Sequence, residues 1–262
     1  MPLGHSLAEE IELDHSWTPR LWWLGHSTFV VKFHAMIFYF DPCLSAMEGR
    51  LVPPPLDPSA IRHADLVLST HIHPHHMDAA TLGAILAASP KAKLVLPKSA
   101  AHHANALGIG FDRMTTTDAD LRVEYFKSGD YARVYAVPAA HPDLAWTPLG
   151  GFPRLGFLLR CGGITIYHAG DGVPYENLVA RLRPYNVTVA LLPIAGDDCF
   201  TIAQAAQLAE DIEARWLVPM HYGTFPHAAG DVSSFVSHML FSRPAQRFKV
   251  FEPGEGWTIP ED

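Results

Sequence analysis

The sequence predicts an α/β (α+β) fold of the four-layer αββα sandwich type, in which two packed sheets carry helices on their outer faces. Three observations support this prediction. Short apolar segments rich in β-branched and aromatic residues alternate with segments rich in alanine and leucine. Both halves of the chain follow an order of strands and then helices, and polar residues follow the strand ends. We expect one domain that spans residues 1–262.

The composition is that of an ordinary globular protein, with 48% hydrophobic and 18% charged residues. A formal charge of −8 and the lack of a basic run argue against nucleic-acid binding. We expect no secretory signal and no membrane span, since no apolar run approaches the ~18–20 residues that a span requires. Cys43, Cys161 and Cys199 are widely spaced, so we expect small buried hydrophobes in a reducing cytoplasm.

The first half of the chain is expected to contain strands, beginning with an antiparallel pair, and two helices. The predicted strands are residues 20–32, interrupted by Gly25-His26-Ser27, and residues 36–40, 66–70 and 94–96. The predicted helices are residues 78–88, for which Asp78 is a suitable N-cap, and residues 99–107, which Gly108 ends.

The second half repeats this style. Its predicted strands are residues 121–125, 131–138, 156–160, 164–168, 187–193 and 216–219, and its predicted helix is residues 203–214. Three of these strands lead to a polar side chain just past the strand end, namely His141, Asp171 and His221. Loops at strand ends are the usual position of functional side chains on a rigid scaffold.

Histidine is the unusual residue, with 16 copies in 262 residues. Four of them lie within six positions directly after a predicted buried strand, at His71, His73, His75 and His76. His71 and His73 point the same way in an extended segment, whereas the next pair follows a proline bend and can face a second point. Because neutral imidazole is a common ligand of transition metals, one loop could serve two metals. A surface tract or a tag remnant is disfavoured, since the cluster is internal and follows an apolar strand.

His141, Asp171 and His221 strengthen this prediction, because they follow three different strands. Glycines on both sides of Asp171 allow close backbone approach. Each of the three alone would more often be structural, but their combination with the histidine loop favours a metal site. By contrast, we expect His168 to pack in the core and the pair 102–103 to face solvent.

The order of these motifs resembles the metallo-β-lactamase superfamily from about Trp22 to Phe225. The family pattern is a His-x-His-x-Asp-His loop followed by a lone His, a lone Asp and a final His. Within the superfamily the chain looks closest to the branch of L-ascorbate-6-phosphate lactonase and N-acyl-phosphatidylethanolamine-hydrolysing phospholipase D. The matching segments are Trp23-Leu24-Gly25-His26-Ser27-Thr28, Asp41-Pro42, Asp78, Gly170-Asp171 and Pro219-Met220-His221-Tyr222-Gly223-Thr224-Phe225.

The resemblance implies two divalent metal ions, Zn²⁺ first, with Mn²⁺, Fe²⁺ and Ni²⁺ as alternatives. Metal one would be held by three histidines, metal two by two or more, with one aspartate bridging both and another orienting the loop. The implied residues are His71, His73 and His141 for metal one, His76 and His221 for metal two, Asp171 as the bridge and Asp41 as the orienting group.

The sequence departs from the family at His75, where the pattern has aspartate. We include His75 among the predicted metal ligands. Imidazole in place of carboxylate removes one negative charge, which favours zinc, iron or nickel over manganese or magnesium and makes bound water more acidic. Asp78 could supply a carboxylate instead, although its expected role is the helix cap.

The implied function is a metal-dependent hydrolase in which a hydroxide shared by two metals attacks a lactone, ester or phosphodiester of a small metabolite. The Gly-x-Ser-x-Gly elbow of serine hydrolases is absent. We predict Asp171, His26 and His75 as catalytic residues. An iron-dependent oxidoreductase on the same fold and a metal-binding protein without catalysis remain as alternatives. The expected partner is a small molecule, and the sequence leaves the subunit number open, with a homo-oligomer allowed.

Overall fold

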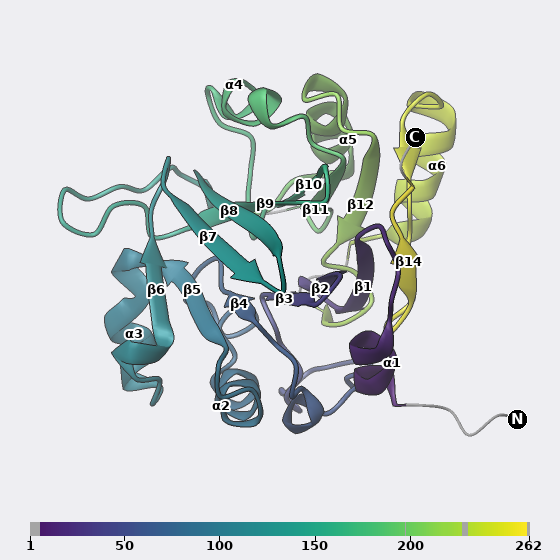
Figure 1. Cartoon of the computed structure of the whole chain (residues 1–262). Helices are drawn as coiled ribbons and strands as arrows, with labels where there is room; N and C mark the ends of the chain where they lie inside the picture. Colours follow the sequence, from purple (N-terminus) through teal and green to yellow (C-terminus); the bar gives the residue numbers. More distant parts are fainter. Residues whose placement is uncertain (1–5, 197, 227–229, 261–262) are drawn as a thin grey trace, which may run out of the picture.

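Two seven-stranded sheets pack face to face in the computed structural model, which describes residues 6–196, 198–226 and 230–260. Figure 1 shows α2 and α3 on one side of the sheets and α4 and α5 on the other. The expected α/β sandwich with helices outside is therefore confirmed. Among the described residues, no helix has both the length and the apolar character that crossing a bilayer requires.

The first sheet has the strand order β14-β1-β2-β3-β4-β5-β6. Its strands are β1 (Arg20–Gly25), β2 (Thr28–Phe33), β3 (Met36–Phe40), β4 (Leu66–Leu68), β5 (Lys93–Pro97), β6 (Met114–Thr117) and β14 (Gly256–Thr258). The pairs from β14 to β3 are antiparallel, and those from β3 to β6 are parallel.

The second sheet has the order β13-β12-β11-β10-β9-β8-β7. Its strands are β7 (Arg122–Lys127), β8 (Asp130–Pro138), β9 (Leu155–Cys161), β10 (Ile164–His168), β11 (Val189–Pro193), β12 (Trp216–Met220) and β13 (Arg247–Phe248). The pairs from β7 to β10 are antiparallel and those from β10 to β13 are parallel.

The helices are short and cover the outer faces of the sheets. They are α1 (Leu7–Leu13), α2 (Ala79–Ala88), α3 (Ala101–Ala106), α4 (Leu178–Leu182), α5 (Ile202–Asp211) and α6 (Val232–Ser242), with 3₁₀ turns at Pro58–Ala60, Lys98–Ala100, Phe111–Arg113 and Arg183–Tyr185. Asp78 caps α2 as expected, and Gly108 follows α3 with a φ of 91°.

Successive side chains of β1 point to opposite faces of the sheet and pack in two different hydrophobic cores. Trp23 lies in the core between the sheets, whereas its neighbours Trp22 and Leu24 lie in a second core beneath α1, α2 and α3. Both faces of the strand are therefore buried, so the sequence shows a continuous apolar run instead of a polar–apolar alternation.

The sequence prediction was wrong at the first strand. Residues 20–32 form two strands, β1 and β2, because Gly25 and His26 have φ angles of 102° and 51° and reverse the chain. The predicted helix 203–214 is α5, which ends at Asp211. Residues 99–107 divide into a 3₁₀ turn and α3. The elements α1, β6, α4, α6, β13 and β14 were not predicted.

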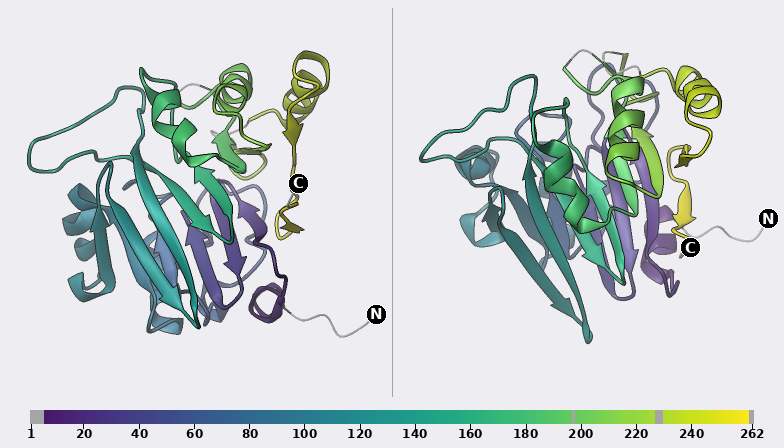
Figure 2. Two further views of the ribbon diagram at one scale, coloured as in Figure 1. Left: turned by 45° about the horizontal axis from the view of Figure 1, so that its top comes forward. Right: turned by 90° about the horizontal axis from the view of Figure 1, so that it is seen from above.

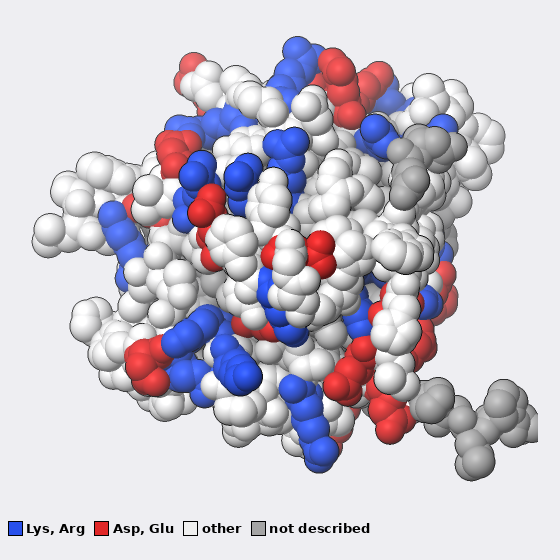
Figure 3. Space-filling view, in the orientation of Figure 1, with Lys and Arg blue, Asp and Glu red and all other residues white. Residues whose placement is uncertain are grey.

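The loop between β8 and β9, residues 139–154, extends beyond the sheets (Figure 2) and exposes Trp146 and Leu149. Over the described part of the face in Figure 3, basic side chains lie beside acidic ones. On this face, the absence of a basic run in the sequence thus corresponds to a surface of mixed charge.

Candidate metal centre

The carboxyl ends of four strands lie at one edge of the sandwich and position the predicted site residues there. The histidine loop follows β4, His141 follows β8, Asp171 follows β10 and His221 follows β12. These side chains surround a cavity of about 410 Å³. The cavity is lined by His26, His73, Pro74, His75, His76, His141, Asp171, Ala195, Gly196, Asp198, Cys199 and His221.

Asp171 lies at the centre of this arrangement. Its Oδ2 is 3.2 Å from His71 Nε2 and 3.6 Å from His73 Nδ1. Its Oδ1 is 2.9 Å from His76 Nε2 and 3.4 Å from His221 Nε2. The two oxygens of one carboxylate therefore face two separate sets of imidazoles.

His141 adds to the set around Oδ2. Ligand atoms of His73, His141 and Asp171 all lie within 4.8 Å of one another. The His141 Nδ1 is 2.6 Å from the carbonyl oxygen of Asp198, and this oxygen can only accept a hydrogen bond. His141 therefore carries its proton on Nδ1, which leaves Nε2 free to bind a metal.

Hydrogen bonds from the far side fix the protons of the buried imidazoles. The His76 Nδ1 donates to Asp41 Oδ2 at 2.6 Å, and the Thr70 hydroxyl donates to the same oxygen at 2.8 Å. Because the one proton of this hydroxyl is used, His71 Nδ1 must donate to Thr70 Oγ1 at 2.9 Å. In the neutral imidazoles, both Nε2 atoms then direct a lone pair toward Asp171, as metal ligands do.

The spacing of the donor atoms around Asp171 leaves room for cations between the imidazoles and the carboxylate. Among the described residues, His71 Nε2, His221 Nε2 and Asp171 Oδ1 are buried and make no hydrogen bond. Lone pairs facing a carboxylate would repel it without a positive charge between them. Two ligands about 2.1 Å from one tetrahedral cation stand about 3.4 Å apart, close to the observed separations. The residues present therefore fit a divalent metal on each side of Asp171.

The electrostatics agree with this interpretation. Burial raises the pKa of Asp171, but the imidazoles of His76 and His221 lower it well below its ordinary range. Burial and the neighbouring imidazole of His76 lower the pKa of His71 to about 4, and burial lowers that of His221 to about 3. Burial also opposes charge on His76, yet Asp171 and Asp41 outweigh it and raise its pKa to about 10. A proton and a cation therefore compete for the Nε2 of His76.

Three residues of the site hold a left-handed backbone conformation that side chains other than glycine rarely adopt. The φ angles are 51° at His26, 41° at Asp41 and 62° at His221. Each is held by a backbone hydrogen bond: the His26 amide donates to Thr224 Oγ1, the Asp41 amide to the Leu68 carbonyl and the His221 amide to the His26 carbonyl. The surrounding fold thus positions these side chains.

His26 belongs to the same cluster. Its ring stacks on that of His221, with centroids 4.0 Å apart and an angle of 14° between the planes. Its Nδ1 is buried and has no hydrogen-bond partner among the described residues, and its ligand atoms lie near those of His76 and His221. Burial and the neighbouring imidazoles lower the pKa of His26, so the ring is neutral near pH 7.

His75 and Asp78 have different positions. The His75 ring lines the cavity beside Phe225 and His26, at centroid distances of 4.5 and 5.4 Å. The metal-ligand groups found among the described residues do not include it, so its predicted role as a ligand stays a prediction. The Asp78 carboxylate accepts hydrogen bonds from Ser45, Ala80 and Thr81, which confirms the helix cap.

Three other histidines occupy the places that the sequence predicted. His168 is buried against Phe40, and its Nε2 donates to the Ser27 carbonyl at 2.8 Å. His102 and His103 are exposed on α3. These residues stabilise or cover the fold outside the metal centre.

One residue near the donor groups was not predicted from the sequence. Cys199, expected to be a small buried hydrophobe, is indeed buried, but its Sγ lies within 4.8 Å of ligand atoms of Asp171 and His221. Its place on the loop after β11 follows no spacing rule, so only the folded chain shows it. Burial and the Asp171 carboxylate raise the pKa of this thiol.

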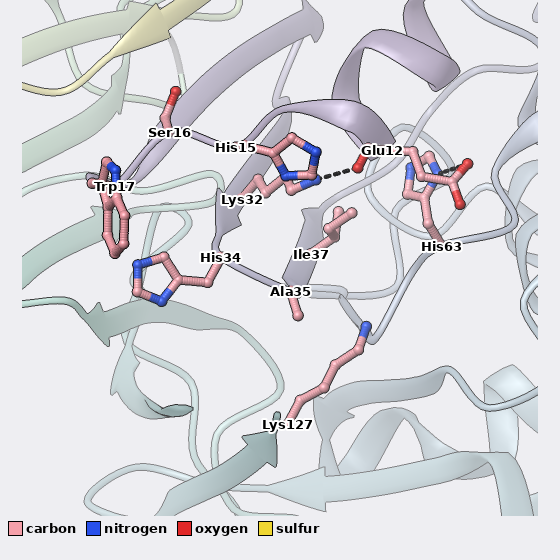
Figure 4. Close-up of a pocket in the computed structure, with 10 residues that line it drawn as sticks. All are labelled: Glu12, His15, Ser16, Trp17, Lys32, His34, Ala35, Ile37, His63 and Lys127. Atoms are coloured by element: carbon pink, nitrogen blue, oxygen red, sulfur yellow. Dashed lines mark hydrogen bonds and ion pairs between the residues drawn. The ribbon is translucent and has the colours of Figure 1, made fainter. Parts of the chain in front are cut away.

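A larger cavity, of about 590 Å³, lies at the other end of the sandwich (Figure 4). His34 and His63 line it, but His34 contacts Asp130 at 2.9 Å and His63 contacts the Tyr39 hydroxyl at 2.7 Å. In the described part of the chain, no residue of this cavity belongs to a group of three or more metal-ligand atoms. The candidate metal centre is therefore the cavity around Asp171.

The two-sheet sandwich with ligand groups at the carboxyl ends of its strands defines a protein of the metallo-β-lactamase fold. Residues 20–221 match the model of the beta-lactamase superfamily domain, and the chain belongs to that family. A relative from Myxococcus xanthus, named "UPF0173 metal-dependent hydrolase", is 32% identical over 90% of this chain and 82% of its own length.

Solved structures agree with this assignment. Igni18, described as a novel metallo hydrolase from the archaeon Ignicoccus hospitalis, superposes with a TM-score of 0.71 at 25% identity, over 94% of this chain and all of that one. The metallo-β-lactamase fold protein YhfI from Bacillus subtilis gives a TM-score of 0.64 at 14% identity, over 92% of this chain and 99% of that one. The second similarity concerns the fold alone.

Proposed function

We propose that this chain is a metal-dependent hydrolase that cleaves a lactone, ester or phosphodiester bond of a small metabolite. The observation that carries the proposal is the Asp171 carboxylate, whose two oxygens each face a buried imidazole. Among the described residues, Asp171 Oδ1 and the Nε2 atoms of His71 and His221 are buried without a hydrogen bond. The name of the Myxococcus xanthus relative, a metal-dependent hydrolase, supports the same class.

In this proposal, His71, His73 and His141 would hold one cation, His76 and His221 would hold the other, and Asp171 would contribute to both sites. Two such cations, Zn²⁺ in first place because of the imidazole ligands, would acidify a water molecule and polarise the bond to be cleaved. The fold contributes fixed positions: Asp41 and Thr70 hold the tautomers of the buried histidines before any cation binds.

His26 and His75 act from the wall of the cavity in this scheme. Both rings line it beside the donor atoms. A neutral imidazole in this position, as His26 is near pH 7, can accept a proton from the water molecule that attacks the substrate. The cavity volume of about 410 Å³ suits a small molecule or one end of a larger one.

We also propose that the protein works in a reducing compartment, the cytoplasm. Cys43, Cys161 and Cys199 are all buried and free of disulfide bonds. Buried single thiols are usual in compartments where disulfides do not form.

The proposed function is tested with protein purified without a histidine tag. Metal is removed by chelation and returned one ion type at a time, and turnover is measured on a panel of lactones, nitrophenyl esters and bis-nitrophenyl phosphate. We expect two metals per chain and hydrolysis that returns with metal. Asp171→Asn should lose both, whereas the control Asp130→Asn, a carboxylate paired with His34 at the opposite end, should keep both.

Three results would contradict the hydrolase proposal. One is oxygen uptake with an iron-loaded protein and no hydrolysis, which would favour the oxidoreductase. Another is full metal occupancy without turnover on any substrate, which would favour a binding protein. The third is hydrolysis that Asp171→Asn leaves unchanged.

A further inference from the structure

We propose that the Cys199 thiolate is a ligand of the metal beside Asp171 Oδ1. This inference deepens the proposed function and rests on it, because it requires a cation in the buried half of the centre. Its starting point is position: the Sγ of Cys199, an oxygen of Asp171 and a ring nitrogen of His221 all lie within 4.8 Å of one another.

The buried half of the centre needs a further donor. Asp171 Oδ1 faces His76 Nε2 at 2.9 Å and His221 Nε2 at 3.4 Å, which supplies three donors to a metal that prefers four. The nitrogen of His221 and the oxygen of Asp171 are both buried and make no hydrogen bond among the described residues. The two unsatisfied polar atoms thus belong to the same group of closely spaced ligand residues as the thiol.

Cys199 is better placed than His75 to complete this set. It lines the same cavity and belongs to one of the metal-ligand groups, whereas the ring of His75 packs against Phe225 at 4.5 Å. Sulfur reaches a metal at about 2.3 Å, so a small movement of one side chain suffices to close the set.

Charge supports the same assignment. Without Cys199, the buried cation would have two neutral imidazoles and half of one carboxylate. A thiolate adds a full negative charge in a place from which water is largely excluded. When the metal binds, the S–H bond is replaced by a sulfur–metal bond and the proton leaves to solvent, so charge and atoms balance. Thiolate also shifts the preference of this site toward zinc and away from manganese.

A second role is conceivable from the same geometry. The His221 Nδ1 is 3.8 Å from Cys199 Sγ, so the sulfur could accept a hydrogen bond and only orient the imidazole. In that case the sulfur would lie behind the ring and make no bond to the metal. A spectroscopic measurement separates the two roles, because only a thiolate bonded to the metal gives a sulfur-to-metal charge-transfer band.

The test uses the full-length protein loaded with Co²⁺ by stepwise addition. We expect two cobalt ions per chain and a near-ultraviolet sulfur-to-cobalt charge-transfer band that grows with one of the two equivalents. Cys199→Ser should lose the band and bind that equivalent at least about tenfold more weakly, with the other site unchanged. Cys199→Asp should recover the affinity without the band.

Cys161→Ala is the matched control, because Cys161 is also buried but lies at the end of β9 opposite the metal centre. It should keep the band. Two bound cobalt ions without a band in the wild type would overturn the inference and leave the hydrolase proposal intact, as would a band that persists in Cys199→Ser. A wild type that binds no cobalt at all would instead overturn the metal centre itself.

Discussion

The two halves of the metal centre differ in how deeply they are buried. The side chains of His76 and His221 are 1% and 3% exposed. In the other half, His71 is also buried, at 2%, but His73 is 42% exposed. In the buried half, His76 is hydrogen-bonded to the buried Asp41 carboxylate. The open half includes His141 at the start of the extended loop 139–154. This difference suggests that the buried half holds its metal as part of the fold, while the open half receives the substrate.

The strongest test of this comparison is His76→Ala beside His73→Ala. Loss of His76 leaves Asp41 and Asp171 buried without their shared partner, which costs about 3–5 kcal/mol of stability in the metal-free protein. We expect a loss of about 10³-fold in turnover together with a lower melting temperature. His73→Ala should lower turnover but leave the metal-free melting temperature within a few degrees. Calorimetry after chelation measures both, and equal shifts would refute the difference between the halves.

Asp41→Asn should act next most strongly, on the affinity for metal. An amide cannot accept the hydrogen bonds of His76 and Thr70 as a charged carboxylate does, so the tautomers are no longer fixed. We expect the affinity of the buried site to fall by about 10–100-fold. Competition with a fluorescent chelator measures it. Asp130→Asn serves as the control, and a similar fall there would show a general effect of lost charge.

His26→Asn should reduce catalysis while keeping both metals. Asparagine tolerates the left-handed backbone at this position, so the substitution removes the ring without adding strain. If His26 passes a proton, the rate should fall by at least about 10²-fold and the pH profile should change shape. Metal content by mass spectrometry should stay at the wild-type value. A variant that loses metal in parallel with rate would assign His26 to metal binding instead.

The smallest effect is expected at the extended loop. Trp146 lies on this loop and is 56% exposed. Trp146→Ala should change KM a few-fold for bulky substrates and leave kcat and metal content unchanged. A large fall in kcat would show that the loop closes over the open half and belongs to the catalytic apparatus.

The sequence predicted the fold because apolar strands follow local rules, and the resemblance to the family indicated which residues the strand ends would bring together. Apolar strands that end in polar residues indicated where the strand ends would meet, and the structure brings His71, His73, His141, Asp171 and His221 together. The capping box of Ser6 and Glu9 is a local signal for the start of α1, a helix that was not predicted. The short strands β13 and β14 carry too few residues for a periodic signal.

The contribution of Cys199 could not be predicted from local patterns. Cys199 belongs to no spacing motif, and it lies near Asp171 and His221 only in the folded chain. The position of His26 depends on the same kind of long-range contact, since its amide donates to Thr224, 198 residues away. Side chains that are positioned by tertiary contacts carry no signature in the neighbouring sequence.

Anomalous diffraction at the zinc edge, from crystals of the tag-free protein, tests the central claim most directly. The account predicts two peaks, one on each side of the Asp171 carboxylate, the first beside His71, His73 and His141 and the second beside His76 and His221. Peaks elsewhere in the protein, or Asp171 hydrogen-bonded to imidazoles with no metal between them under saturating zinc, would contradict it.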